Sequence, residues 1–307
     1  RLNRNPKLKK TILVNTRILT REFDYHQPGS LAEAFELLAE CGDAAKVIAG
    51  GTDVVPQLKY EKIAPNHLVT LMKIPGLGDI QEDNGGLVIG ACARLVDVKQ
   101  ACARDAGIEA LHDALRSIGK VQVMNMGTLG GNLCTASPAA DSVPPLLVLN
   151  GRVTLASREG SRTLGLGDFI TGPYAAAMAA GEIMTEIHIP PGEDHQGSAF
   201  LKVARVAADI SKLSCAVALQ RDGDRCGSCR IALGAVAPVP MRVKGPEEIL
   251  SGRQMDAALL DKAAERVSAE IRPISDVRST ENYRREVAAV IFIDVFDMAW
   301  ERAGGKR

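Results

Sequence analysis

Two glycine-rich segments contain the residues of this sequence best suited to bind a ligand. Gly50-Gly51-Thr52-Asp53 follows the apolar run 44–49, and Gly127-Thr128-Leu129-Gly130-Gly131-Asn132 lies later in the chain. Successive backbone N–H groups of a glycine turn form a concave nest that holds phosphate oxygens. Glycine is needed there because it adopts positive φ and lets the backbone approach a ligand closely. The two segments together predict a site for an extended ligand with a pyrophosphate in its middle.

Neither segment has the pattern of the common phosphate-binding loops. The Gly-Lys-Ser/Thr ending of a Walker A loop and the G-x-G-x-x-G of doubly wound dinucleotide folds are both absent. The side chains instead offer hydroxyl and amide donors at Thr52, Thr128 and Asn132. Asp53 is expected to cap the helical turn that begins at Val54. For the first segment taken alone, a tight turn without a ligand is the alternative.

Periodic patterns predict the elements that position these segments. Ser30-Leu31-Ala32-Glu33 is a capping box that opens a helix, and Asp83-Asn84-Gly85-Gly86 is a hairpin turn. Further strands and helices are predicted at 45–49, 67–71, 87–91, 94–103, 107–118 and 182–189. Pro190-Pro191-Gly192 indicates a domain boundary. Beyond it, strands at 198–206, 213–220 and 229–236 precede helices at 256–271 and 281–302.

Composition limits the class of protein. The chain has 307 residues, with 37 basic and 37 acidic side chains and a net charge of zero. This balance and an aromatic content of 4% argue against a nucleic-acid partner. No run of about 18 apolar residues is present, so no transmembrane segment is predicted. The seven cysteines are odd in number and scattered, which is typical of reduced thiols, and we expect a cytoplasmic protein.

The sequence has few other residues whose pattern suggests a catalytic or metal-binding site. The five histidines (26, 67, 112, 188 and 195) are isolated, and no HExxH, nucleophile elbow or paired carboxylates are evident. We therefore expect no catalytic side chain and no metal ligand on this chain. Cys226-Gly-Ser-Cys229 is the one CxxC. Two incidental thiols are one interpretation of it, and a redox or metal site, which needs two further ligands, is the other.

Longer stretches around the glycines resemble a known family. VIAGGTDVVPQLK (47–59) and MGTLGGNLCTASPAAD (126–141) resemble the FAD-binding medium subunit of the molybdenum hydroxylases, a group that includes xanthine dehydrogenase and carbon monoxide dehydrogenase. EIMTEIHIP (182–190) and SAFLKVARVAADIS (198–211) are similar and occur in the same order. The resemblance covers residues 22–298. It implies an α+β protein, with a two-lobed FAD-binding fold of the vanillyl-alcohol oxidase type and a C-terminal α+β domain of antiparallel strands with helices.

The resemblance also implies a division of the chain. An N-terminal extension would occupy 1–21, FAD-binding lobe 1 residues 22–77, lobe 2 residues 78–192 and the C-terminal domain residues 193–307. The extension is basic, with five basic side chains in its first ten residues. It is interpreted as a flexible terminus, with an arm that docks on a partner subunit as the alternative.

Roles for single residues follow from the resemblance. The pyrophosphate would be cradled by Ile48, Ala49, Gly50, Gly51, Thr52, Asp53 and Val54. The other side of the FAD would be held by Thr128, Gly130, Gly131, Asn132, Thr135 and Asp141. Ile183 and Met184 match positions against the isoalloxazine ring, with core filling as the alternative for Met184. Lys202 matches a lysine near the flavin, with a solvated strand lysine as the alternative, and Ile118 stands where some relatives have an aromatic residue.

The resemblance finally implies a function. The chain would be an electron-transfer subunit whose FAD receives electrons from [2Fe–2S] clusters on a small partner subunit and passes them to NAD⁺, a quinone or oxygen. A large partner subunit would carry the molybdopterin cofactor, and the assembly would be a dimer of heterotrimers. The alternatives are a free-standing flavin oxidoreductase of the same fold and a non-catalytic scaffold subunit.

Overall fold

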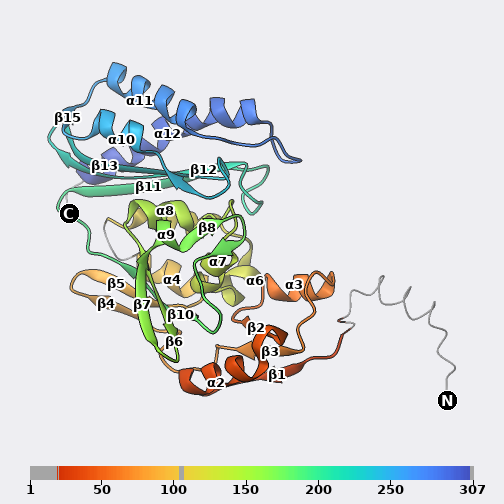
Figure 1. Cartoon of the computed structure of the whole chain (residues 1–307). Helices are drawn as coiled ribbons and strands as arrows, with labels where there is room; N and C mark the ends of the chain where they lie inside the picture. Colours follow the sequence, from red (N-terminus) through yellow and green to blue (C-terminus); the bar gives the residue numbers. More distant parts are fainter. Residues whose placement is uncertain (1–18, 20, 104–106, 305–307) are drawn as a thin grey trace, which may run out of the picture.

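A computed structural model describes residues 19, 21–103 and 107–304. The predicted extension 1–21 lies outside these ranges apart from Leu19 and Arg21. Three larger sheets follow one another through the molecule, and helices lie between and around them (Figure 1). None of the helices in the described ranges has the length and apolarity needed to cross a bilayer.

The small sheet is parallel and has the order β1-β3-β2. Its strands are β1 (Asp24–His26), β2 (Ala45–Ile48) and β3 (His67–Thr70). Its helices are α2 (Leu31–Cys41), the 3-10 turn η1 (Gly42–Ala44) and α3 (Val54–Lys59). The predicted capping box begins α2: Ser30 Oγ accepts the N–H of Glu33 at 3.2 Å, and the Glu33 carboxylate accepts the N–H of Gly29 at 2.7 Å.

The register of the small sheet brings two histidines together. Asp24 of β1 lies opposite His67 of β3, and alternate residues of a strand share one face of a sheet. His26 is therefore on the same face as His67, and its Nε2 atom lies 3.2 Å from Nδ1 of His67. These two histidines are isolated in the sequence but not in the structure.

The central sheet is antiparallel, with the order β4-β5-β10-β6-β7. Its strands are β4 (Ile80–Asp83), β5 (Gly86–Gly90), β6 (Arg152–Ser157), β7 (Gly160–Gly165) and β10 (Ile183–Ile189). Two short strands, β8 (Ile170–Gly172) and β9 (Ala175–Ala176), pair separately. The helices beside this sheet are α4 (Leu95–Cys102), α5 (Glu109–Ser117), α6 (Val121–Met126), α7 (Leu129–Thr135), α8 (Val143–Val148) and α9 (Leu166–Phe169). The predicted hairpin at 83–86 joins β4 to β5.

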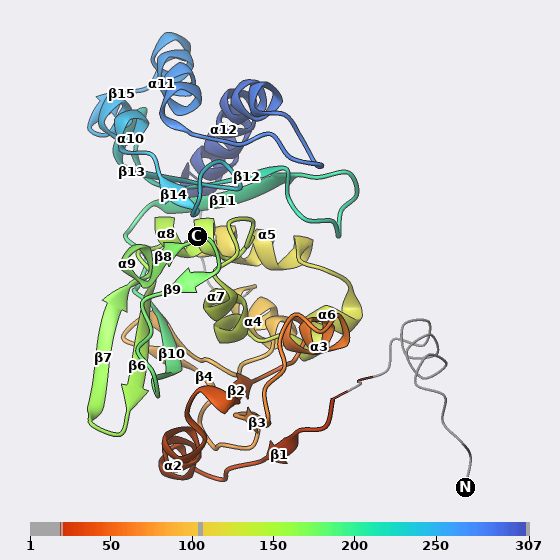
Figure 2. The same cartoon turned by 45° about the vertical axis from the view of Figure 1, so that its right-hand side comes forward.

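The C-terminal sheet lies between two layers of helices (Figure 2). Its strands are β11 (Gln196–Val203), β12 (Leu213–Asp222), β13 (Arg225–Gly234), β14 (Met241–Arg242) and β15 (Arg253–Gln254). One layer consists of α10 (Lys244–Leu250), α11 (Ala257–Glu270) and α12 (Glu281–Gly304), and α5 and α8 lie on the other side. Along β12, Ala216 and Ala218 pack into the core of the central sheet, whereas Val217 and Leu219 pack against the C-terminal helices. Alternate side chains are thus buried on both faces, and the predicted α+β class is confirmed.

Candidate functional site

The two glycine segments touch each other. A Cβ atom at Gly50 would lie 1.7 Å from the carbonyl oxygen of Met126, and one at Gly127 would lie 3.4 Å from Oγ1 of Thr52. Only glycine at position 50 lets the two backbones approach this closely. Figures 1 and 2 both show α3, which follows the first segment, beside α6, which precedes the second. The packing therefore forms one candidate site from segments far apart in sequence.

The first segment has the properties of an anion cradle. Gly51 adopts a φ of 72°, a left-handed conformation that glycine accepts without strain. Within the described ranges, the backbone N–H groups of Gly50, Gly51, Thr52 and Asp53 have no protein acceptor. Consecutive N–H groups of this kind are available to phosphate oxygens.

The side chain of Asp53 does not make the helix-capping contact that was predicted for it. Asp53 occupies the position before α3, but its side chain accepts no hydrogen bond from that helix. Instead, Oδ2 of Asp53 lies 2.8 Å from Oγ1 of Thr135, whose single hydroxyl proton is shared with the Gly131 carbonyl oxygen at 2.9 Å. The Asp53 carboxylate thus joins the loop after β2 to the end of α7, and the prediction that it caps α3 is wrong.

The second segment is mainly a helix rather than the donor-rich loop predicted. Thr128 precedes α7, and its Oγ1 accepts the N–H of Gly131 at 3.1 Å. The N–H of Gly130 donates to the carbonyl oxygen of Ala91 at 3.0 Å, and a Cβ at Gly130 would lie 2.5 Å from that oxygen. These glycines therefore let α7 pack closely against the chain after β5, and both N–H groups are used inside the protein.

Polar side chains continue from α7 towards the C-terminal sheet. Ser142 Oγ donates to Asn132 Oδ1 at 2.6 Å, which leaves the amide Nδ2 of Asn132 as a donor. The adjacent Asp141 is buried, and its carboxylate accepts hydrogen bonds from Ser211 and Lys202. Burial raises the pKa of Asp141, while the Lys202 charge and the hydrogen bonds from Ser211 and Lys202 oppose that shift.

Lys202 is buried rather than solvated, so the alternative of a solvated strand lysine is wrong. Its side chain is 6% exposed, and its Nζ lies 2.9 Å from Oδ2 of Asp141. Nζ also donates to the carbonyl oxygens of Ser117 and Asp209 at 2.6 and 3.0 Å. Three acceptors thus use the three N–H groups of the ammonium. Because Ile118 directly follows Ser117, Lys202 joins β11 to the chain segment that holds Ile118.

The residues predicted to lie against the isoalloxazine ring are covered by protein. Ile183 and Met184 begin β10 and are 1% and 3% exposed. Ile183 packs with Leu71 and Cys92 in a small core, and Met184 packs in the core of the central sheet. Ile118 is partly buried against that second core. Core filling, the alternative for Met184, describes its packing here.

Comparison with known proteins identifies the family. Residues 21–192 match the family described as the FAD binding domain in molybdopterin dehydrogenase. Residues 198–299 match the family described as the CO dehydrogenase flavoprotein C-terminal domain. The chain belongs to the FAD-binding subunits of the molybdenum hydroxylases. FAD is accordingly its cofactor, as the resemblance implied.

Similar proteins cover nearly the whole of this medium subunit. The glyceraldehyde dehydrogenase medium chain of Sulfolobus acidocaldarius is 33% identical over 90% of this chain and 97% of its own. The xanthine dehydrogenase FAD-binding subunit of Escherichia coli O157:H7 is 32% identical over 92% and 97%. A carbon monoxide dehydrogenase structure from Hydrogenophaga pseudoflava, which lacks the Mo-pyranopterin moiety, has a TM-score of 0.89 at 31% identity, over 93% and 99%. The chain is an oxidoreductase subunit, as predicted.

Two serine side chains and one serine carbonyl oxygen bind the polar residues of the candidate site, and none of these serines was predicted as a site residue. Ser142 binds Asn132, Ser211 binds Asp141, and the Ser117 carbonyl binds Lys202. No spacing in the sequence distinguishes these serines from others. Only the folded structure shows that they contact Asn132, Asp141 and Lys202.

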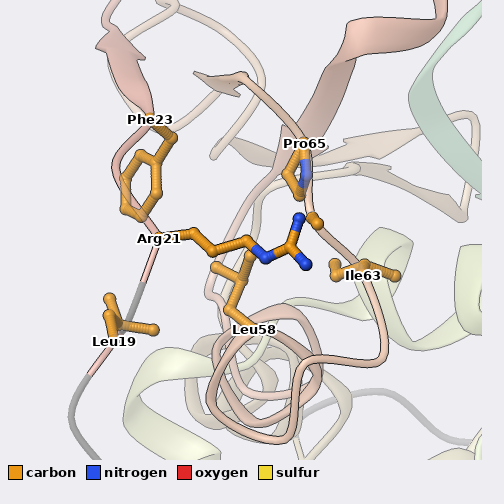
Figure 3. A pocket seen from close by; sticks show the side chains of 7 residues that line it. Leu19, Arg21, Phe23, Leu58, Ile63 and Pro65 are labelled. Atoms are coloured by element: carbon orange, nitrogen blue, oxygen red, sulfur yellow. The ribbon is translucent and has the colours of Figure 1, made fainter. Parts of the chain in front are cut away.

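A small pocket beside α3 lies apart from the predicted FAD residues (Figure 3). Its lining is formed by Leu19, Arg21, Phe23, Leu58, Ile63, Ala64 and Pro65. The Arg21 side chain extends across it between apolar neighbours. Because none of the residues predicted to hold FAD lines this pocket, it is not the candidate cofactor site.

The CxxC lies in the C-terminal core. Cys226 and Cys229 are both buried, and a register shift between β12 and β13 lies between their partners Arg221 and Leu219. A hydrogen bond with Cys226 and burial raise the pKa of the Cys229 thiol. Within the described ranges, neither thiol belongs to a group of three potential metal ligands. The described residues therefore supply no third ligand for the metal interpretation.

Proposed function

We propose that this medium subunit transfers electrons from [2Fe–2S] clusters of a small partner subunit, through its FAD, to NAD⁺, a quinone or oxygen. The main support is the row of backbone N–H groups at residues 50–53, held against the second glycine segment in a chain of the FAD-binding family. Bound flavin supplies chemistry that links one-electron and two-electron transfer. The protein supplies binding, orientation and exclusion of water.

Residues 48–54 are proposed to hold the pyrophosphate of FAD. The N–H groups of Gly50 to Asp53 are the donors, and the hydroxyl of Thr52 adds another. Asn132 offers its amide from the facing helix α7. The contact between Thr135 and Asp53 links the two elements that carry these donors.

The remaining predicted residues are proposed to position the flavin ring. Ile183 and Met184 lie inside the protein cores at the start of β10, and they are proposed to support the chain beneath one side of the ring from within. Lys202 and Asp141 act as a buried pair that keeps the segment around Ile118 in place. Thr128, Gly130 and Gly131 shape the N-terminal end of α7.

The partners proposed are a large molybdopterin-binding subunit and a small [2Fe–2S] subunit, in a dimer of heterotrimers. Relatives named as medium chains of dehydrogenases support this proposal. We place the complex in the cytoplasm because scattered cysteines of odd number are typical of reducing compartments.

A visible spectrum of the purified chain tests the cofactor. We expect flavin absorption and about one FAD released by acid per chain. Reduced small subunit should then bleach the flavin anaerobically, and NAD⁺, a quinone or oxygen should restore its colour.

Two other results contradict the proposal. A colourless chain that takes up no FAD is a scaffold. A flavin that is reduced by an organic substrate without partner subunits belongs to a free-standing oxidoreductase.

A further inference from the structure

Three potential metal ligands from different elements meet beside the small sheet. They are His26 at the end of β1, Cys41 at the end of α2 and His67 at the start of β3. One ligand atom of each lies within 4.8 Å of the other two. All three side chains are partly buried. Among the described residues, no other group of at least three histidine, cysteine or acidic residues is arranged in this way.

The separation between the two histidine nitrogens is close to that of neighbouring ligands in a tetrahedral site. Bonds of about 2.0–2.1 Å to nitrogen and about 2.3 Å to sulfur place neighbouring ligand atoms about 3.3–3.6 Å apart. Nε2 of His26 lies 3.2 Å from Nδ1 of His67. Oδ2 of Asp24 lies 3.5 Å from the same Nδ1 atom. The ligand atom of Cys41 lies within 4.8 Å of those of both histidines, and it must come to about 3.6 Å for the three residues to share one ion.

We propose that His26, Cys41 and His67 bind a zinc-class divalent cation. Two imidazoles and a thiolate suit a borderline-soft ion such as Zn²⁺, whereas Mg²⁺ and Ca²⁺ prefer oxygen ligands. A water molecule takes the fourth position, because Asp24 does not belong to the group whose ligand atoms all lie within 4.8 Å of one another. Binding releases the thiol proton of Cys41 to solvent, because the thiolate is the ligand. This proposal replaces the expectation, drawn from the sequence, that no residue of this chain binds a metal.

The ion is structural in this proposal. It joins the first strand, the first helix and the middle strand of the small sheet, whose buried core is limited to a few side chains. Metal bonds between elements stabilise the folded state when the core alone is small. Cys41 is followed by η1 and β2, which lead directly to Gly50. The ion thus fixes the chain just before the proposed pyrophosphate cradle.

A hydrogen bond between the two imidazoles, with Asp24 beside them, is the competing explanation of the same geometry. Metal content distinguishes the two. The full chain is prepared without a histidine tag, treated with a chelator and dialysed against limiting Zn²⁺. We expect about one Zn²⁺ per chain, with a raised melting temperature. Co²⁺ should give the thiolate-to-metal charge-transfer band and the visible bands of a tetrahedral site.

Conservative variants identify the ligands. Cys41→Ser should abolish the charge-transfer band and, like His67→Gln, weaken Zn²⁺ binding more than about tenfold. His188→Gln and Cys134→Ser change a histidine and a cysteine elsewhere in the chain and should bind Zn²⁺ as the wild type does. Circular dichroism verifies that each variant is folded.

Two results overturn the proposal: a wild-type chain that retains no Zn²⁺, or Cys41→Ser that binds Zn²⁺ as tightly as the wild type. If His67→Gln does not fold, Cys41→Ser alone decides. Metal content is measured with and without bound flavin. A failure of Zn²⁺ binding can therefore be distinguished from a failure of FAD binding.

Discussion

Lys202 is a charged side chain that the interior accepts because three oxygen atoms surround its ammonium group. Two of them are main-chain carbonyl oxygens, and the third belongs to the Asp141 carboxylate. A buried charge is costly unless it is paired and hydrogen-bonded. The two residues therefore depend on each other, and removal of either charge leaves the other without a counter-ion.

Asp141→Asn tests this dependence. Asparagine keeps the size of the side chain and can still accept from Ser211, but Lys202 then has no counter-ion. We expect the free energy of unfolding to fall by about 3–5 kcal/mol, the usual cost of breaking a buried pair. Urea unfolding followed by circular dichroism measures this change.

The matched control is Asp97→Asn, which breaks the exposed pair with Arg94. Exposed pairs contribute little to stability, so this variant should unfold close to the wild-type urea concentration. Equal effects of the two substitutions would show that the burial of Asp141 does not matter.

At the scale of elements, the candidate site depends on how closely backbone segments approach. Gly50 lies against Met126 and Gly127, and Gly130 lies against Ala91. The first contact joins the loop after β2 to the end of α6. The second seats α7 on the chain after β5. Both contacts fix the separation of the donors around the proposed pyrophosphate position.

Gly50→Ala should disturb this arrangement. The new Cβ would lie 1.7 Å from the Met126 carbonyl oxygen, so the two segments must separate. Overpacking of this kind costs about 1–3 kcal/mol. We therefore expect a lower melting temperature and a lower ratio of flavin to protein absorbance after gel filtration.

Gly78→Ala is the matched control, because a Cβ there meets nothing within 4 Å. It should retain flavin as the wild type does. A Gly50→Ala protein with full flavin content would show that the close contact is not needed for binding.

At the scale of the whole molecule, the size of the buried hydrophobic core differs between regions. The C-terminal sheet and its helices share a large buried core of their own. The small sheet has two minor cores, one of which it shares with Cys92 and Ile183. A ligand held between the small sheet and α7 should therefore stabilise the small sheet most.

Hydrogen exchange with and without FAD measures this difference. A ligand at 100 times its Kd stabilises the state that binds it by about 2.7 kcal/mol, which corresponds to about 100-fold slower exchange through opening of that state. We expect such slowing for amides at 45–59. Amides of α12 serve as the internal reference and should change little. Uniform slowing over the whole chain would instead show that the molecule opens as one unit.

The sequence by itself determined many of the elements and the family. Capping residues at 30–33, the turn at 83–86 and the alternating strands after Pro191 were all predicted, because these signals depend on hydrogen bonds and side-chain periodicity within short segments. The two glycine motifs predicted the FAD-binding family. The lobe boundary at 77/78 and the domain boundary at 192/193 stay predictions.

Tertiary structure alone decided which residues meet. Asp53 pairs with Thr135 rather than capping α3, the second glycine segment is a helix, and Lys202 is buried. His26 lies against His67 although many residues separate them in the chain. Such contacts arise from the packing of distant elements. Because burial and counter-ions are properties of that packing, local sequence patterns do not contain them.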